Sequence, residues 1–246
     1  MKMTNKSKTI NYDSPLYLQV RDFIERKIKS KEFLPGMAIP STNEFARLLG
    51  INRLTVNAAF EGLVDEGILK RVQGKGSFVV GKKIAHNLEK LQGFNQTVNG
   101  HSIELSIKVL KKYKRVAGKY YAHKFGIKEN DLLYYIERLY YIDNSPSSVV
   151  ETLVLDKIVP KIEGIDLSVF SLNEVYGFYG INLKKGIQTL ELVNLDHKEA
   201  KLLDLSDNDD ALMIDSSIFD ENNNLIEISI NYTKSELSEF TVHFKE

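Results

Sequence analysis

The sequence predicts an α+β protein made of two domains that differ in size and charge. Helical patterns followed by a short hairpin pattern occupy residues 12–81, whereas strand patterns dominate residues 93–246. Residues 1–83 carry 15 Lys and Arg against 8 Asp and Glu, and the remainder carries 18 against 25. This asymmetry indicates that the smaller part meets a polyanion. We expect a small helical domain, a linker over residues 82–92 and a larger domain with a mixed sheet.

The composition excludes several classes of protein and of site. The chain has 246 residues and no cysteine, so a disulfide scaffold, a thiolate nucleophile and a cysteine zinc site are excluded. No apolar stretch approaches the ~18 residues that indicate a membrane span. The polar start also lacks the apolar core of a signal peptide. We therefore expect a cytoplasmic protein without a membrane partner.

Two helices are predicted in the first 50 residues. Apolar residues at spacings of three and four predict a first helix that begins near Pro15 and ends before Pro35. Ser41 and Glu44 have the spacing of a capping box, in which the serine oxygen accepts a backbone N–H and the glutamate reaches back. The second helix is expected to run from Glu44 to about Leu49.

A third helix follows after only a few residues, with Asn52 as its N-cap. Arg53 and Asn57, four residues apart, share one polar face near its start. The opposite face carries the residues expected to be buried: Val56, Ala59, Phe60, Leu63 and Val64. Two helices joined by a tight turn form a helix-turn-helix, whose second helix presents its first residues to base edges in the major groove.

The helical period ends at Gly67 and a hairpin pattern begins. Residues 68–72 and 77–80 are typical of two short strands around Gln73-Gly74-Lys75-Gly76. The glycines allow close approach to a backbone, and Lys75 at the tip can neutralise a phosphate. The hairpin is therefore predicted to be the wing of a winged helix-turn-helix.

The same stretch also suggests a phosphate-binding loop. Residues 76–83, GSFVVGKK, nearly match the pattern GxxxxGK[ST]. However, Lys83 stands where the magnesium-binding hydroxyl is needed, and the inner residues are mostly apolar and typical of a strand. We therefore favour the hairpin over a nucleotide site.

Six short motifs lie at nearly fixed spacing within residues 14–80: PLYLQV, LPG, IPS, NRLTV, EG and GKGSFV. Together they resemble the winged-helix domain of GntR-family transcription regulators. The resemblance implies that Arg53 and Thr55 lie at the DNA surface, with the Gly74–Gly76 wing in the minor groove. The candidate DNA-binding residues are Ser41, Asn43, Asn52, Arg53, Thr55, Asn57, Arg71, Gly74, Lys75 and Gly76.

Two positions depart from the usual pattern of that family. Asn57 stands where relatives often have arginine, and Asn43 where they commonly have a charged residue. Arginine prefers the two acceptors of guanine, whereas asparagine pairs bidentately with adenine. We hypothesise that the operator has adenine where relatives read guanine, through Asn57. The alternative is a solvated helix residue that contacts no base.

In the larger domain, the order helix–strand–turn–strand occurs twice. A first strand is expected at residues 103–109, followed by one unit over residues 119–153 and a second over residues 196–232. The two units are about 78 residues apart. We predict a duplication that builds one mixed sheet with helices packed against it.

Short motifs of this domain point to a second resemblance. They are ERLY at 137–140, the turn at 143–146, Glu151, VYG at 175–177, Ile226-Glu227 and Tyr232. They resemble the effector-binding (UTRA-type) domain of HutC-type GntR regulators, which has a chorismate-lyase-like fold. Residues 93–246 are then expected to bind an effector and to dimerise.

The second resemblance also implies which residues bind the effector. Arg138 would bind its anionic group through a guanidinium fork, and Glu151, Glu227 and Tyr232 would hold hydroxyls or an amine. Tyr140 stands where many relatives have a second arginine. With one guanidinium fewer, a carboxylate, a less charged ligand or a phosphate helped by backbone N–H groups becomes the expected partner.

From these observations we expect a homodimeric transcription repressor that binds a near-palindromic double-stranded DNA operator. A phosphosugar or a carboxylate would control it. The alternatives are a ligand-independent architectural DNA-binding protein and a lyase-like enzyme fused to a DNA-binding domain. We expect no catalysis, cofactor or metal, because the five histidines are scattered and no nucleophile elbow or His-Glu-x-x-His helix occurs.

Overall fold

The computed structural model describes residues 14–81, 105–207 and 209–237, which fall into two structural units. The first unit covers Met1–Lys83 with the short segment Gly164–Asp166, and the second covers the rest of the chain. The expected linker at residues 82–92 lies outside the described residues, as do the first two residues of the strand expected at 103–109. None of the described helices has the length and apolarity needed to cross a membrane.

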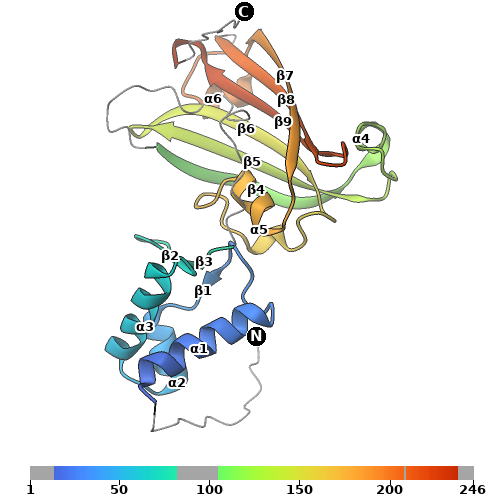
Figure 1. The fold of residues 1–246 in the computed structure, drawn as a ribbon. Helices are drawn as coiled ribbons and strands as arrows, with labels where there is room; N and C mark the ends of the chain where they lie inside the picture. The colour runs from blue at the N-terminus through green and yellow to red at the C-terminus, as the bar shows by residue number, and fades with distance from the viewer. Residues whose placement is uncertain (1–13, 82–104, 208, 238–246) are drawn as a thin grey trace, which may run out of the picture. The chain divides into compact units, whose positions relative to one another are not determined.

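Within residues 14–81, helices α1, α2 and α3 accompany a small antiparallel sheet of order β1-β3-β2 (Figure 1). The elements are α1 (Leu16–Lys29), β1 (Ala38–Ile39), α2 (Thr42–Leu49), α3 (Arg53–Asp65), β2 (Leu69–Val72) and β3 (Gly76–Val79). Pairing of β2 with β3 confirms the predicted hairpin. Strand β1 was not predicted, because two residues are too few for a periodic pattern.

The helix starts follow the predicted capping. The Ser41 hydroxyl accepts the N–H of Glu44 at 3.3 Å, and the Glu44 carboxylate accepts the N–H of Ser41 at 2.7 Å. The Asn52 side-chain oxygen accepts the N–H of Leu54 at 2.8 Å. Gly50 ends α2 with a φ of 68°, which glycine adopts without the strain of a side chain. Caps and glycine together produce the tight turn of the helix-turn-helix.

An aromatic cluster centred on Phe45 holds the three helices together. This ring is fully buried and meets Phe23, Phe33 and Phe60 edge to face, with centroids 6.2, 6.4 and 5.6 Å away. Such arrangements add to the free energy gained by burying the rings. They fix α2 against α1 and α3, which sets the direction of the recognition helix α3.

The second unit is built on a six-stranded sheet of order β4-β5-β6-β9-β8-β7 (Figure 1). Its strands are β4 (Leu105–Val116), β5 (Leu132–Ile142), β6 (Ser145–Leu155), β7 (Leu183–Asn194), β8 (Asp210–Asp220) and β9 (Leu225–Lys234). Its helices are α4 (Gly118–Phe125), α5 (Leu172–Phe178) and α6 (His197–Leu202). Short 3-10 turns lie at Ser235–Leu237 and at Ile162–Gly164, whose last residue belongs to the segment assigned to the first unit.

The predicted duplication is present in the strand positions and in the pairing. Strand β4 begins at Leu105 and β7 at Leu183, while β5 begins at Leu132 and β8 at Asp210, so both pairs are separated by 78 residues. The two copies join through β6 and β9 at the centre of the sheet. Consequently β4 and β7 occupy equivalent positions at its two edges.

The α+β fold class is confirmed, but the expectation of a mixed sheet was wrong. Every pairing in the described sheet is antiparallel, because each copy is a β-meander and the copies meet through antiparallel strands. Helix α5 and strand β7 were also missed. Most of β7 is solvent-exposed, so its sequence lacks the alternation of a half-buried strand.

Different helices pack against the two faces of the sheet. Helix α4 packs on Leu133 of β5 and α6 packs on Leu139, so both lie on the side of the odd-numbered β5 residues, here called the α4/α6 face. The other side carries Arg138 and, through the strand register, Glu227. We call it the α5 face, because Tyr176 of α5 bonds Glu227 there.

Candidate functional site

The first turn of α3 places several predicted DNA-binding residues on the surface of the first unit. Arg53 is exposed and Thr55 is partly buried. Ser41 and Asn52 use their side-chain oxygens as helix caps, so each has a structural role independent of DNA. Asn43 is exposed on the first turn of α2.

Leu54 is an exposed residue that the sequence analysis did not single out. Its side chain is 76% exposed, between Arg53 and Thr55 on the first turn of α3. The sequence pattern does indicate that Leu54 is exposed, because this residue lies outside the apolar spacing that begins at Val56. An exposed aliphatic side chain in this place can contact the methyl group of a thymine.

Asn57 has two partners within the protein, which bears on the adenine hypothesis. Its amide nitrogen donates to Glu61 at 2.8 Å, and its oxygen accepts from the guanidinium of Arg71 at 3.1 Å. Bidentate pairing with adenine uses the same two atoms, so both bonds would have to open on binding. In the state observed, Asn57 orients Arg71 of β2 beside the recognition helix.

The wing has the geometry predicted for it. Gly74 and Gly76 have φ values of 73° and 112°, and the N–H of Lys75 donates to the carbonyl of Val72 at 3.1 Å. These φ values lie in the region that favours glycine, so the turn depends on both residues. Lys75 is exposed at the tip between them.

The adenine hypothesis yields a prediction about base preference. Asn57→Arg is expected to shift the preferred base at one position of each half-site by about 5- to 150-fold, the range given by ~1–3 kcal/mol per bidentate contact. Binding to operators substituted one position at a time measures it. Glu61→Gln is the control, because it weakens the same internal contact without adding a guanidinium. An unchanged base preference at every position would reject the hypothesis.

The five predicted effector-binding residues do not form one cluster. Side chains alternate along a strand, so Arg138 and Tyr140 lie on the α5 face, where Glu227 also lies. Glu151 pairs with Glu137, and Tyr232 pairs with Val149, which places both on the α4/α6 face. The structure therefore brings three of the five together and separates two.

A β-bulge explains the separation. Strand pairing shifts between Tyr140 and Tyr141, where Ser147 is the extra residue and its hydroxyl donates to the carbonyl of Tyr140 at 3.1 Å. One added residue moves every later side chain to the other face. Without the bulge, Glu151 would share a face with Arg138.

On the α5 face, Arg138 is buried without a matched acid. Its side chain is 6% exposed, and its guanidinium lies 5.6 Å from the Tyr140 ring centroid. One Nη reaches the hydroxyl of Thr152 at 3.5 Å, at the limit of a hydrogen bond, and Nε has no hydrogen-bond partner within the described residues. An unsatisfied buried donor on a charged group is costly.

Glu227 lies near Arg138 but is held by a different partner. The Tyr176 hydroxyl donates to its carboxylate at 2.5 Å. Burial raises the pKa of Glu227 above its usual range, although Tyr176 and the charge of Arg138 act against that rise. Burial and Glu227 also raise the pKa of Tyr176. The Glu227 carboxylate is therefore hydrogen-bonded to Tyr176 and not to Arg138.

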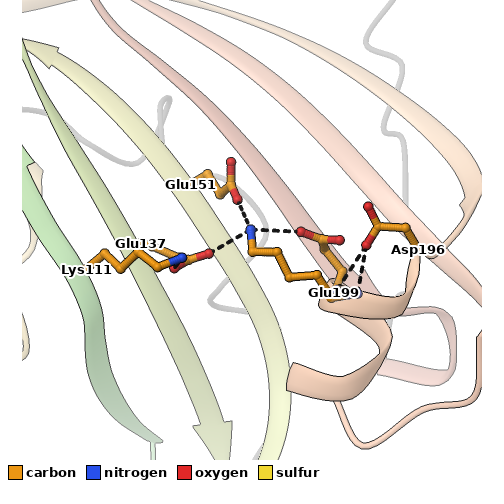
Figure 2. Close-up of polar contacts among 6 residues, drawn as sticks. Lys111, Glu137, Glu151, Asp196 and Glu199 are labelled. Atoms are coloured by element: carbon orange, nitrogen blue, oxygen red, sulfur yellow. Dashed lines mark hydrogen bonds and ion pairs between the residues drawn. The ribbon is translucent and has the colours of Figure 1, made fainter. Parts of the chain in front are cut away.

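On the α4/α6 face, an internal ammonium group occupies the place expected for a ligand. Figure 2 shows carboxylates from β5, β6 and α6 converging on one cation. It is Lys198 of α6, whose Nζ lies 2.9 Å from Glu137, 2.6 Å from Glu151 and 3.1 Å from Glu199. Lys111 of β4 contacts Glu137 from the other side at 2.7 Å. Glu151, expected to hold an effector hydroxyl or amine, instead holds this lysine.

The ionisation of this cluster follows from its contacts. Glu137 is 1% exposed, and burial alone would raise its pKa, but hydrogen bonds from Lys111 and Lys198 outweigh burial and lower it. Burial lowers the pKa of Lys198, but Glu151 and Glu137 outweigh burial and raise that pKa to about 12. Glu137 and Lys198 are therefore both charged near neutral pH.

Several residues of these clusters were not predicted as site residues. They are Thr152, Tyr176, Lys111, Glu137 and Lys198. Contacts between Tyr176 and Glu227, or between Lys198 and Glu137, join residues more than 50 positions apart, which no local pattern indicates. Within the described residues, no group of His, Asp and Glu side chains is arranged to hold a metal ion.

Two family descriptions match the chain. Residues 101–237 match the UTRA domain, and residues 16–79 match the family described as bacterial regulatory proteins, gntR family. These ranges contain the six-stranded sheet and the winged helix-turn-helix, respectively.

Individual relatives are similar over nearly the whole chain. The HTH-type transcriptional regulator YurK of Bacillus subtilis is 26% identical, over 94% of this chain and 96% of its own length. The histidine utilization repressor of Pseudomonas aeruginosa is 25% identical, over 82% and 80%. The crystal structure of PhnF from Mycobacterium smegmatis has a TM-score of 0.55 at 20% identity, over 92% of this chain and all of that chain. This last likeness bears on the fold alone.

Proposed function

We propose that this chain, which belongs to the HutC-type subfamily of the GntR family of transcription regulators, is a repressor controlled by a small anion that binds at Arg138. The winged helix-turn-helix binds operator DNA, and the UTRA domain senses the ligand. Relatives that are named repressors support the direction of control.

The observation that carries this proposal is the environment of Arg138. Arg138 is 6% exposed, and its guanidinium has only a 3.5 Å hydrogen bond to Thr152 and a nitrogen without a hydrogen-bond partner in the described part of the chain. Buried charges in proteins are normally paired. A carboxylate or phosphate oxygen would supply the missing acceptor through a charge-assisted fork.

The neighbours of Arg138 favour a ligand of low charge. Tyr140 offers an aromatic ring in place of a second guanidinium, and the carboxyl group of Glu227 lies on the same face of the sheet, bonded to Tyr176. A carboxylate matches one guanidinium directly. A phosphate monoester would leave part of its second charge without a cation, so we rank the carboxylate first.

Control requires the ligand to prefer one arrangement of the protein over another. Because Arg138 is nearly inaccessible, a ligand can reach it only when part of its cover moves. We propose that α5 is that part, since Tyr176 of α5 is bonded to Glu227 beside Arg138. A coupling of ~1–3 kcal/mol would change operator affinity about 5- to 150-fold.

On the DNA side, we propose a homodimer in which each α3 reads one half of a near-palindromic operator. A twofold protein requires a twofold site. Arg53 and Leu54 would approach base edges, while Lys75 and Arg71 would approach phosphates.

The test is a thermal-shift screen with separate panels of carboxylates and phosphate monoesters. A ligand that binds the native protein at 100 times its dissociation constant adds ~2.7 kcal/mol to the free energy of unfolding and raises Tm. Arg138→Ala should abolish the rise and leave operator binding unchanged, whereas Arg115→Ala, an exposed arginine of the same sheet, should keep it. A rise that survives Arg138→Ala would contradict the proposed site. Indifference to both panels would favour a ligand-independent DNA-binding protein.

A further inference from the structure

Asn57 connects two groups of opposite charge on the surface of the first unit. Its amide nitrogen donates to Glu61, one helical turn further along α3, and its amide oxygen accepts from Arg71 of β2. Only this orientation of the amide satisfies both neighbours, because a guanidinium can only donate hydrogen bonds and an ionised carboxylate can only accept them. The three side chains therefore form one ordered set of hydrogen bonds, here called the Asn57 network.

The packing of β2 directs Arg71 toward α3. Side chains alternate along a strand, so Arg71 lies on the same face of β2 as Leu69. Leu69 is buried in one cluster with Phe60 and Leu63 of α3, which shows that this face of the strand packs on the helix. Arg71 is exposed two residues nearer the wing turn, where it meets Asn57. The burial of Leu69 thus places the guanidinium of Arg71 between the recognition helix and the wing.

Arg71 is held in place but has donors to spare. A guanidinium carries five N–H donors, and within the described residues Arg71 uses one Nη, which donates to Asn57 at 3.1 Å. Asn57 is held in turn by Glu61 at 2.8 Å, so the arginine has lost part of its rotamer freedom before any partner binds. A side chain ordered in advance binds at a smaller entropic cost. The remaining edge of the guanidinium matches two oxygens of a phosphate.

We infer that Asn57 and Glu61 are positioning residues, which hold Arg71 as a preformed clamp for one phosphate of the DNA backbone beside α3. The inference rests on the proposed DNA binding and names how Arg71 takes part in it. A phosphate contact fixes the register of the helix in the groove without reading the sequence. Direct pairing of Asn57 with adenine would use both amide atoms and release both partners. In the clamp, Asn57 contacts no base and acts through Arg71 alone.

A double-mutant cycle tests whether Asn57 acts through Arg71. Affinity is measured by fluorescence anisotropy, on the duplex that the parent protein selects from a random-sequence library. Arg71→Ala should weaken binding about 100-fold, since a dimer loses two charge-assisted contacts. Asn57→Ala should weaken it about tenfold in the parent, where Arg71 must then be immobilised on binding, and by less than about twofold in the Arg71→Ala background. Alanine is a good helix former, so α3 should fold in each variant.

Two further measurements separate positioning from base reading. Arg71→Ala should make the slope of log K against log salt shallower by about two units, one for each protomer, whereas Asn57→Ala should keep the parental slope. Asn57→Asp/Glu61→Gln keeps both hydrogen bonds of the network, because the new carboxylate accepts from Arg71 and from the new amide. It removes the donor that N7 of adenine needs. This variant should therefore keep the parental ranking of operators substituted one position at a time.

Arg26→Ala is the control, because it removes the same charge at an exposed position of α1 and should leave operator affinity within about twofold of the parent. Equal losses from Asn57→Ala in both backgrounds, or a changed ranking of operators in Asn57→Asp/Glu61→Gln, would overturn the inference and leave the proposed DNA binding intact. A parent protein that binds no duplex would overturn both.

Discussion

The double variant Arg53→Glu/Lys75→Glu is expected to bind operator DNA at least about 1000-fold more weakly than the parent protein at physiological salt. Arg53 is exposed on the first turn of α3, and Lys75 is exposed at the tip of the wing. Each contact between a cation and a phosphate releases condensed counterions, and a dimer has two copies of each residue. Reversing the charges replaces four attractions with four repulsions.

Fluorescence anisotropy with labelled duplex, recorded over a range of salt concentrations, measures this loss. The slope of log K against log salt should also become shallower, by roughly one unit for each phosphate that the variant no longer neutralises. Lys128→Glu/Lys157→Glu is the matched control, because it changes the net charge equally at exposed residues of the second unit. Parental affinity in the Arg53/Lys75 variant would show that another surface holds the DNA.

The DNA-binding unit was predictable because local rules determine it. The capping box at Ser41, the N-cap at Asn52 and the glycines at 74 and 76 each fix a start, a stop or a turn within a few residues. The structure reproduces those elements nearly to the residue. The partners of Asn57 were not predictable in the same way, because Arg71 reaches it from another strand.

In the second unit, the strands were predictable and the division of the site between two faces was not. The period of two along β5 does place Arg138 and Tyr140 together. Which face Glu151 takes depends on a single bulge residue, Ser147, and the sequence around it does not distinguish a bulge from a regular hairpin. Tyr176 comes from a helix of seven residues, too short for a clear period.

The duplication shows why a partial prediction was still informative. Two units with the same order of elements require a symmetric sheet, whatever the detailed side-chain contacts are. Because of that symmetry, each residue of β7 can be compared with the residue at the equivalent position of β4. The two residues should differ only where their surroundings differ. Lysines at one edge and leucines at the other therefore show that the two edges differ in chemistry.

The cluster around Lys198 leads to the second large expected effect, on stability and its pH dependence. In the parent protein, Lys111 and Lys198 lower the pKa of Glu137 below its usual range. A carboxyl group with a lowered folded-state pKa stabilises the fold above its unfolded value of about 4.5, and this contribution is lost as pH falls through the folded value. The pKa of Lys198 is raised to about 12, so its charge stabilises the fold below the ordinary lysine pKa of 10.5. This stabilisation is lost as pH rises through about 12.

Lys111→Met/Lys198→Met removes both cations and leaves the Glu137 carboxylate, 1% exposed, without either partner. Breaking a buried ion pair from one side typically costs ~3–5 kcal/mol, and we expect about 3 kcal/mol at pH 7 because both lysine side chains are about half exposed. The unpaired carboxyl should then have a raised pKa. The variant should therefore gain stability as pH falls from 7 towards 5, while the parent does not.

Urea unfolding at pH 5, 6 and 7 distinguishes the two behaviours, with Lys111→Met/Glu137→Gln/Lys198→Met as the rescue. Glutamine fills the same space without charge, so the triple variant should recover most of the lost free energy and lose the dependence on pH. Glu151 and Glu199 also lose their cation with Lys198, so recovery should be incomplete. Equal stability of the double variant and the parent at pH 7 would mean that Glu137 does not depend on these lysines. Since α6 contacts the sheet's carboxylates through Lys198, the result also measures how firmly α6 is held on β5 and β6.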